Sequence, residues 1–207
     1  MTDPPTTVTP IGHLAEEGVT GRHPRPMVAL VEADQAPLLA RPYFAGGDPG
    51  PIIAALAQVP ELLEATAPFL GRVLGPSCLS ARLKEIVILR TSARASCRYC
   101  VEAHTVVARD VGLSVAEVRA LRGELDAPSA FADPAERAVI DWCDALVGTG
   151  PVGDEVKAVL RHLFADHKVV ELTLLGATTV LLNRFCTALD LPTSPAVAAR
   201  LVAEGLS

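Results

Sequence analysis

The chain has 207 residues, of which half are apolar and one fifth are charged, and this balance excludes a disordered chain while allowing a sizeable buried core. Its net charge of −6 provides no basic field for a phosphate backbone, so no nucleic-acid partner is expected. The N-terminus lacks the basic and apolar regions of a secretory signal, and the longest apolar segment, residues 169–182, is too short to span a bilayer. We therefore expect a cytoplasmic protein without a membrane partner.

The first fifty residues are rich in proline, glycine and threonine and show no sustained periodicity. Such a composition is typical of irregular structure, because proline and glycine interrupt both helices and strands. We predict an irregular N-terminal arm over residues 1–50 and one helical domain over residues 51–207.

Helical patterns run from Pro51 to the end of the chain. Pro60, Pro68 and Gly75 are predicted to divide residues 51–75 into short helices, because proline cannot continue a helix interior. Residues 80–96 contain a β-branched run, but their length and helical neighbours favour a helix. No segment bounded by turn residues shows the clean alternation of apolar and polar residues that is typical of a strand, so the predicted fold class is all-α. Further helices are predicted over residues 97–112, 113–123, 133–148, 154–164, 166–191 and 194–205.

One short motif, ASCRYCVEAH at residues 95–104, offers reactive side chains. Ser96 is predicted to cap a helix whose first turns hold Cys97 and Cys100. Because residues three and four apart share a helix face, Cys97, Cys100 and His104 are expected to lie along one line. The helix N-terminus stabilises a thiolate, and a neighbouring imidazole lowers a thiol pKa further. Two such thiols can reduce a peroxide: one attacks it, and the other expels water from the resulting sulfenic acid.

A carboxylate on the preceding helix completes this group. Glu85 lies twelve residues before Cys97 among apolar neighbours, where an unpaired carboxylate would be costly. His104 is its predicted partner, and a Glu–His pair beside Cys100 would act as a proton relay.

The spaced set of Glu85, Cys97, Cys100 and His104 resembles the signature of the AhpD-like alkylhydroperoxidases in the carboxymuconolactone decarboxylase superfamily. The segments VGLSVAEVRAL, DPAERAVIDWCDAL and VVELTLLGATTVLLNRFCTALDLP also resemble those that follow it in that family, so the likeness covers residues 51–192. The resemblance implies an AhpD-like, all-helical homo-oligomer, either a trimer or a multiple of one. It also implies a thiol-dependent peroxidase or disulfide oxidoreductase.

The resemblance further implies a role for each site residue. Cys100 would become the sulfenic acid, Cys97 would resolve it, and Glu85 and His104 would activate the thiol. The helix dipole alone favours Cys97 as the attacking thiol, but we expect a base one turn from Cys100 to outweigh it. The implied partners are a hydroperoxide substrate and an external thiol or dihydrolipoyl-type reductant, with no cofactor and no metal ion. Tyr99 is a departure, since the founding enzymes carry a further histidine there.

Two other functions stay open. Cys97, Cys100, His104 and Glu85 could supply four ligands to a zinc ion in a non-catalytic or redox-sensing helical oligomer. The chain could also be a non-redox enzyme acting on a cyclic lactone, although the decarboxylase branch of the superfamily lacks the cysteine pair.

The remaining cysteines, Cys78, Cys143 and Cys186, are predicted to be buried packing residues, and Glu171 is predicted to pair with a residue such as Arg184. A weak internal echo places residues 84–100 over residues 170–186 and aligns Cys100 with Cys186. Chance explains this echo about as well as an ancient duplication.

Overall fold

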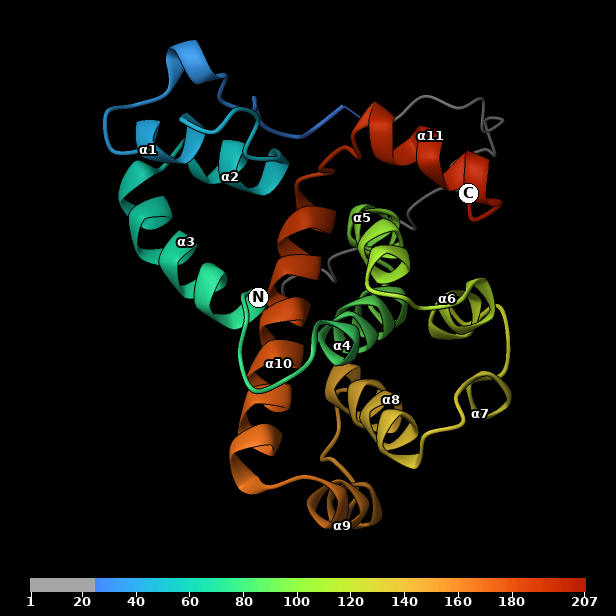
Figure 1. The fold of residues 1–207 in the computed structure, drawn as a ribbon. Coiled ribbons are helices and arrows are strands. Elements are labelled where there is room, and N and C mark those ends of the chain that lie inside the picture. Colours follow the sequence, from blue (N-terminus) through green and yellow to red (C-terminus); the bar gives the residue numbers. More distant parts are fainter. Residues whose placement is uncertain (1–24) are drawn as a thin grey trace, which may run out of the picture.

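Helices are the regular elements of residues 25–207, the part of the chain that this computed structural model describes (Figure 1). The all-α prediction is confirmed for this part. In chain order the elements are the 3-10 helix η1 (Ala33–Gln35) and the α-helices α1 (Arg41–Phe44), α2 (Pro51–Leu56), α3 (Pro60–Leu74), α4 (Ala81–Arg94), α5 (Arg98–Asp110), α6 (Val115–Leu121), α7 (Ala127–Ala130), α8 (Pro134–Val147), α9 (Asp154–Leu163), α10 (Asp166–Ala188) and α11 (Pro195–Glu204).

The longest helix, α10, contacts α3, α4, α5, α8 and α9. In Figure 1 it runs through the middle of the fold, with α1–α3 on one side and α4–α8 on the other. It has 23 residues and contains an 18-residue window with a mean hydropathy of 1.4, which meets the length and composition of a membrane span. However, 44% of this window is buried inside the protein. A core helix passes the same test, so this helix is weak evidence for a membrane segment.

The main hydrophobic core surrounds α4, which packs against α5, α8 and α10. The four consecutive apolar residues 86–89 are all buried, because neighbours cover several sides of this helix. A helix without a solvent face needs no helical periodicity, which explains why this run resembles a strand. Gly176 brings α10 close to α8, since a Cβ at this position would lie 2.6 Å from Leu146 Cδ1.

Side-chain caps fix several helix starts. Ser80 accepts a hydrogen bond from the backbone of Leu83 at the start of α4. Ser114 and Glu117 form the predicted capping box of α6, and each accepts a hydrogen bond from the backbone of the other. Asp133 caps α8 through the backbone N–H of Ala135. These caps satisfy amide groups that a helix leaves without partners at its start.

The predicted break at Pro68 is wrong, because α3 continues through this residue. Proline removes one backbone hydrogen bond, which frees the carbonyl four residues earlier, at Glu64. Both Glu64 and Pro68 are exposed, so this carbonyl can be hydrated and the loss is small. Pro60 occupies the first turn, as predicted.

The N-terminal arm is described only from residue 25, and residues 1–24 of the predicted arm lie outside the described residues. Met27 donates its backbone N–H to Leu189 at the end of α10, and Val31 donates to Ala54 in α2. Val28 and Leu30 pack against a small cluster that contains three cysteines. The arm also forms η1 and α1, so it is less irregular than predicted and covers the site described next.

Candidate active site

The sharp connection between α4 and α5 positions the cysteine pair. Cys97, not Ser96 as predicted, is the N-cap of α5, and its sulfur accepts a hydrogen bond from the backbone N–H of Cys100 at 3.4 Å. Ser96 instead adopts a left-handed conformation with φ of 55°, which turns the chain between the helices. The Cys97 N–H donates to the Ser92 carbonyl at 3.0 Å, so the last turn of α4 holds this corner.

A buried polar contact fixes α10 against the same corner. Asn183 Nδ2 donates to Ser92 Oγ at 2.9 Å, and both residues are fully buried. Cys186 lies three residues after Asn183 and therefore on nearly the same side of α10. This contact fixes the position of α10 relative to the start of α5.

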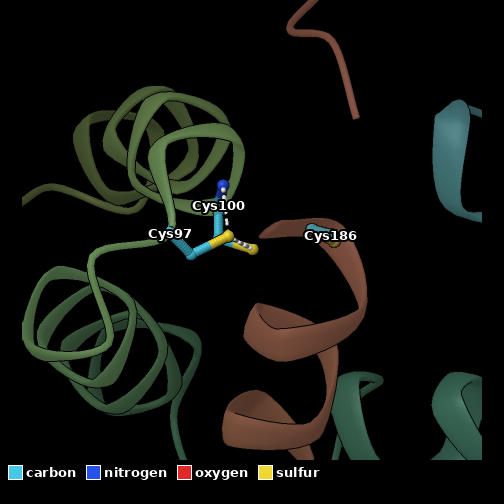
Figure 2. A group of neighbouring side chains, drawn as sticks. All are labelled: Cys97, Cys100 and Cys186. Carbon is cyan, nitrogen blue, oxygen red and sulfur yellow. Dashed lines mark hydrogen bonds between the residues drawn. The ribbon is translucent and has the colours of Figure 1, made fainter. Parts of the chain in front are cut away.

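The structure brings three cysteines together. The sulfurs of Cys97 and Cys100 lie 2.7 Å apart, and those of Cys97, Cys100 and Cys186 all lie within 4.8 Å of one another. Figure 2 shows the pair at the start of α5 and Cys186 near the end of the neighbouring helix α10. Their exposed fractions are 1%, 5% and 1%, so all three thiols are shielded from bulk water.

The three thiols differ sharply in acidity. Hydrogen bonds from Cys100 and then Cys186 lower the pKa of Cys97 to about 3, against the opposing effect of burial. The same bonds raise the pKa of Cys100, through Cys186 first and Cys97 second. For Cys186 the bond with Cys100 lowers the pKa, but the bond with Cys97 and burial outweigh it and raise the pKa to about 12. Negative charge therefore resides on Cys97 in this arrangement.

The predicted Glu–His pair is present. Glu85 Oε2 lies 2.9 Å from His104 Nδ1, which joins α4 to α5 one turn beyond Cys100. The Glu85 side chain is only 9% exposed, whereas that of His104 is 28% exposed. The buried carboxylate thus orients an imidazole that retains access to solvent.

Two cavities meet at Tyr99, the residue between the cysteines. A small cavity of about 80 Å³ is lined by Cys97, Tyr99, Cys186 and Asp190, among others. A larger one of about 370 Å³ lies between α2, α3 and α10, and its wall includes Tyr43, Tyr99 and a set of apolar residues: Ile52, Ile53, Leu70, Leu74 and Leu182. Burial raises the pKa of Tyr99, so its hydroxyl stays neutral.

Two predictions about other residues are wrong. Cys78 is exposed, and its thiol lies 2.7 Å from a carboxylate oxygen of Glu171. Glu171 pairs with Lys84 at 3.3 Å rather than with Arg184, because the buried Lys84 ammonium needs a carboxylate partner. Lys84 also donates to the carbonyls of Val73 and Gly75 at the end of α3.

Sequence reasoning placed Cys186 in the core but missed its proximity to the cysteine pair. The internal echo that aligns it with Cys100 was the one available signal. The predicted zinc ligand set is also changed: within residues 25–207 the group that could hold a metal ion is Cys97, Cys100 and Cys186, without Glu85 or His104.

Comparisons with known proteins agree with this fold. The model of the carboxymuconolactone decarboxylase family matches residues 60–145, which include the whole predicted motif. A comparison with curated protein sequences finds no match.

Solved structures share the fold at low sequence identity. An AhpD-core, peroxidase-related protein from Ralstonia eutropha is 20% identical, with a TM-score of 0.73 over 85% of this chain and 96% of that one. A peroxidase-related protein from Silicibacter sp. is 23% identical, with a TM-score of 0.73 over 87% and 97%. The debrominase Bmp8 is 23% identical, with a TM-score of 0.69 over 83% and 94%. A variant of that debrominase has been solved with 2,3,4-tribromopyrrole.

At these identities the structural likeness establishes the fold alone, and the family model adds a sequence match over residues 60–145. Together they confirm the resemblance found in the sequence: residues 60–145 match the model of the carboxymuconolactone decarboxylase family, and the chain has the AhpD-like fold.

Proposed function

We propose that this protein is a thiol-dependent peroxidase that cycles Cys97 and Cys100 between dithiol and disulfide. The observation that supports this most directly is the 2.7 Å separation of the two sulfurs. The lowered pKa of Cys97 favours its thiolate form at neutral pH. A thiolate is the attacking form of cysteine, and a second thiol within reach of it can close a disulfide.

In the first step, the Cys97 thiolate attacks the outer oxygen of a hydroperoxide. The O–O bond breaks, the sulfur becomes a sulfenic acid, and the alkoxide takes up a proton to leave as an alcohol. This order reverses the roles implied by the family resemblance, because the hydrogen bonds around Cys97 favour it as the ionised thiol. The small cavity beside Cys97 does not include Cys100 in its lining, which also favours attack by Cys97.

In the second step, Cys100 attacks the sulfenic sulfur of Cys97, forms the disulfide and expels water. The hydrogen bond with Cys186 and burial still raise the pKa of Cys100 at this stage, so Cys100 needs a base to become a nucleophile. His104 lies one turn further along α5, and Glu85 orients its ring, so this pair would accept that proton. The net reaction converts two thiols and one hydroperoxide into a disulfide, an alcohol and water.

An external dithiol would complete the cycle by reducing the disulfide, and a dihydrolipoyl-type donor fits the chemistry. The protein would also self-associate. Exposed apolar side chains gather on the outer faces of α3 and α10: Leu62, Phe69, Val170, Leu174 and Leu181. An interface between copies of this chain would bury them.

Steady-state consumption of an organic hydroperoxide with dihydrolipoamide as donor tests the proposal. Turnover that disappears in Cys97→Ser and Cys100→Ser, but persists in Cys78→Ser, supports it. The fold also occurs in a debrominase, so 2,3,4-tribromopyrrole serves as the comparison substrate. Debromination without peroxide turnover would replace the peroxidase assignment.

A further inference from the structure

The proposed redox cycle uses two cysteines, but the structure gathers three. Cys186 reaches the pair from the end of α10, and its sulfur lies within 4.8 Å of both others. It is 1% exposed, and it forms no covalent bond in either step of the cycle. Three soft donors from two helices converge on one point.

We propose that Cys97, Cys100 and Cys186 form a zinc site in the reduced protein, with three thiolate ligands and one ligand from solvent. The site differs from the set predicted from the sequence, because Glu85 and His104 are paired with each other and Cys186 takes part. It does not depend on peroxide chemistry, so its presence can be tested without turnover.

The sulfur geometry is close to what zinc requires. Zn–S bonds are about 2.3 Å long, so three sulfurs around a tetrahedral ion stand about 3.8 Å apart. Here the sulfurs of Cys97 and Cys100 are 2.7 Å apart, and all three sulfurs lie within 4.8 Å of one another. An ion would require the Cys97–Cys100 separation to widen by about 1 Å, which rotations about the Cα–Cβ bonds can supply.

The surroundings favour a thiophilic ion over a hard one. The hydrophobic cluster that contains the three cysteines also contains Ala55 and Leu191, and Val28, Leu30 and Ile52 pack against it. Carboxylate and carbonyl oxygens suit magnesium and calcium, whereas thiolates select zinc and copper(I). A buried thiolate in an apolar surround is costly without a counter-charge, and a divalent cation supplies one.

The cavity beside the sulfurs provides room for the fourth ligand. Its volume is about 80 Å³, and its wall includes Cys97, Cys186, Thr187 and Asp190. A water molecule takes up about 30 Å³, so one or two would fit. Three protein ligands with an open fourth position are the arrangement found in catalytic rather than purely structural zinc sites.

Because zinc and the disulfide use the same sulfurs, each excludes the other. Only the reduced protein would bind the ion, and a bound ion would protect the pair from oxidation.

The first test is a zinc titration of the reduced, metal-stripped full chain in competition with a chromophoric chelator. Wild type should bind one zinc per chain. Cys186→Ser and Cys186→Ala should weaken binding by more than the roughly 10–100-fold that loss of an outer-sphere partner costs. Cys78→Ser is the matched control, since this exposed thiol lies outside the cluster and its loss should leave the affinity unchanged.

Zinc-edge X-ray absorption of the wild-type complex provides a second test that needs no variant. We expect three sulfurs at about 2.3 Å and one lighter ligand. Two sulfurs only, undiminished affinity in the Cys186 variants, or failure of the reduced wild-type chain to bind zinc would each overturn the proposal. Peroxide turnover, measured separately, has no bearing on these outcomes.

Discussion

Cys143 and Cys97 are two almost completely buried cysteines in different regions, with opposite acidities. Cys143 lies in the main core on α8, where burial raises its pKa to about 12. Cys97 lies in the small cluster at the start of α5, where its pKa falls to about 3. Their exposed fractions are 0% and 1%, so burial does not separate them.

The difference lies in the number of hydrogen-bond donors within reach. Cys143 Sγ contacts the Val87 carbonyl at 3.9 Å, and this acceptor cannot stabilise a thiolate. A hydrogen bond with Thr91 lowers the pKa of Cys143, but burial outweighs it. Cys97 caps a helix and receives hydrogen bonds from Cys100, Cys186 and Thr187. Burial makes a thiol inert unless the fold supplies donors for the ionised form.

The largest effect expected is on turnover. Cys97→Ser should reduce hydroperoxide consumption to below about one-thousandth of the wild-type rate, because the nucleophile is lost while serine can still cap α5. Cys143→Ala should keep turnover within about twofold, since this thiol touches no reacting group. Similar losses from both substitutions would remove the distinction between the two regions.

The order of attack can be read from the variant that stops after the first step. In Cys100→Ser, one equivalent of hydroperoxide should leave a sulfenic acid on Cys97, which a dimedone-type reagent would trap on residues 95–98. A trapped sulfenic acid on Cys100 in the complementary Cys97→Ser protein, with none in Cys100→Ser, would restore the roles implied by the family resemblance.

The pH dependence of alkylation should separate Cys97 from an ordinary thiol. A lowered pKa means that the thiolate persists as pH falls, until the pH nears the folded-state value of about 3. The alkylation rate of Cys97 should therefore stay nearly constant from pH 8 to pH 5, whereas a thiol of pKa about 8.5 slows by about 1,000-fold.

Cys78 is the internal reference for this measurement, since a hydrogen bond with Glu171 raises its pKa. Its alkylation should slow about tenfold for each pH unit below neutrality. If Cys97 slows in parallel with Cys78, the assigned thiolate is wrong.

The proton relay should contribute less than the nucleophile. Glu85→Gln preserves the shape of the side chain but removes the charge that orients His104, and we expect about a 100-fold lower rate of disulfide formation. His104→Ala should cost a similar factor, and the double variant should cost little more, because the two residues act as one unit. Rapid quench would give these rates, and fully additive losses would contradict a shared role.

The smallest effect expected is on stability, in the main core. Gly176→Ala should lower the free energy of unfolding by about 1–2 kcal/mol, because the added Cβ would meet Leu146 Cδ1 at 2.6 Å, and this side chain can shift only partly. Gly71→Ala in α3 is the matched control: no atom lies within 4 Å of its added Cβ, and we expect a gain of about 0.5–1 kcal/mol. Denaturant unfolding measures both. Equal changes in the free energy of unfolding for Gly176→Ala and Gly71→Ala would contradict the inference that Gly176 is needed for the close packing of α10.

The sequence predicted those features that depend on local chemistry. Ser114 and Glu117 cap α6 because both capping partners lie within one turn, and the Glu85–His104 pair follows from the cost of burying a lone carboxylate. The all-α class also followed from composition and turn signals.

The features it missed depend on tertiary packing. No sequence feature near Cys186 indicates that this residue lies beside the start of α5. Its position is fixed by the hydrogen bond between Asn183 and Ser92, which lie 91 residues apart in the sequence. Cys97 replaced Ser96 as the cap because the turn between α4 and α5 needs a left-handed residue one position earlier. Both misses lie at the candidate site, where the chain departs from ordinary local preferences.

The most direct test of the proposed redox centre is disulfide mapping after one equivalent of an organic hydroperoxide. The reduced protein would be treated, alkylated and digested with trypsin. Cleavage at Arg98 separates the two cysteines of the pair, so Cys97, Cys100 and Cys186 lie in the separate peptides 95–98, 99–109 and 185–200. The two peptides that a disulfide links therefore identify the two cysteines that form it. We predict a link between 95–98 and 99–109, formed within seconds. Full alkylation of both thiols, or a link that involves 185–200 instead, would contradict the assignment of Cys97 and Cys100 as the redox pair.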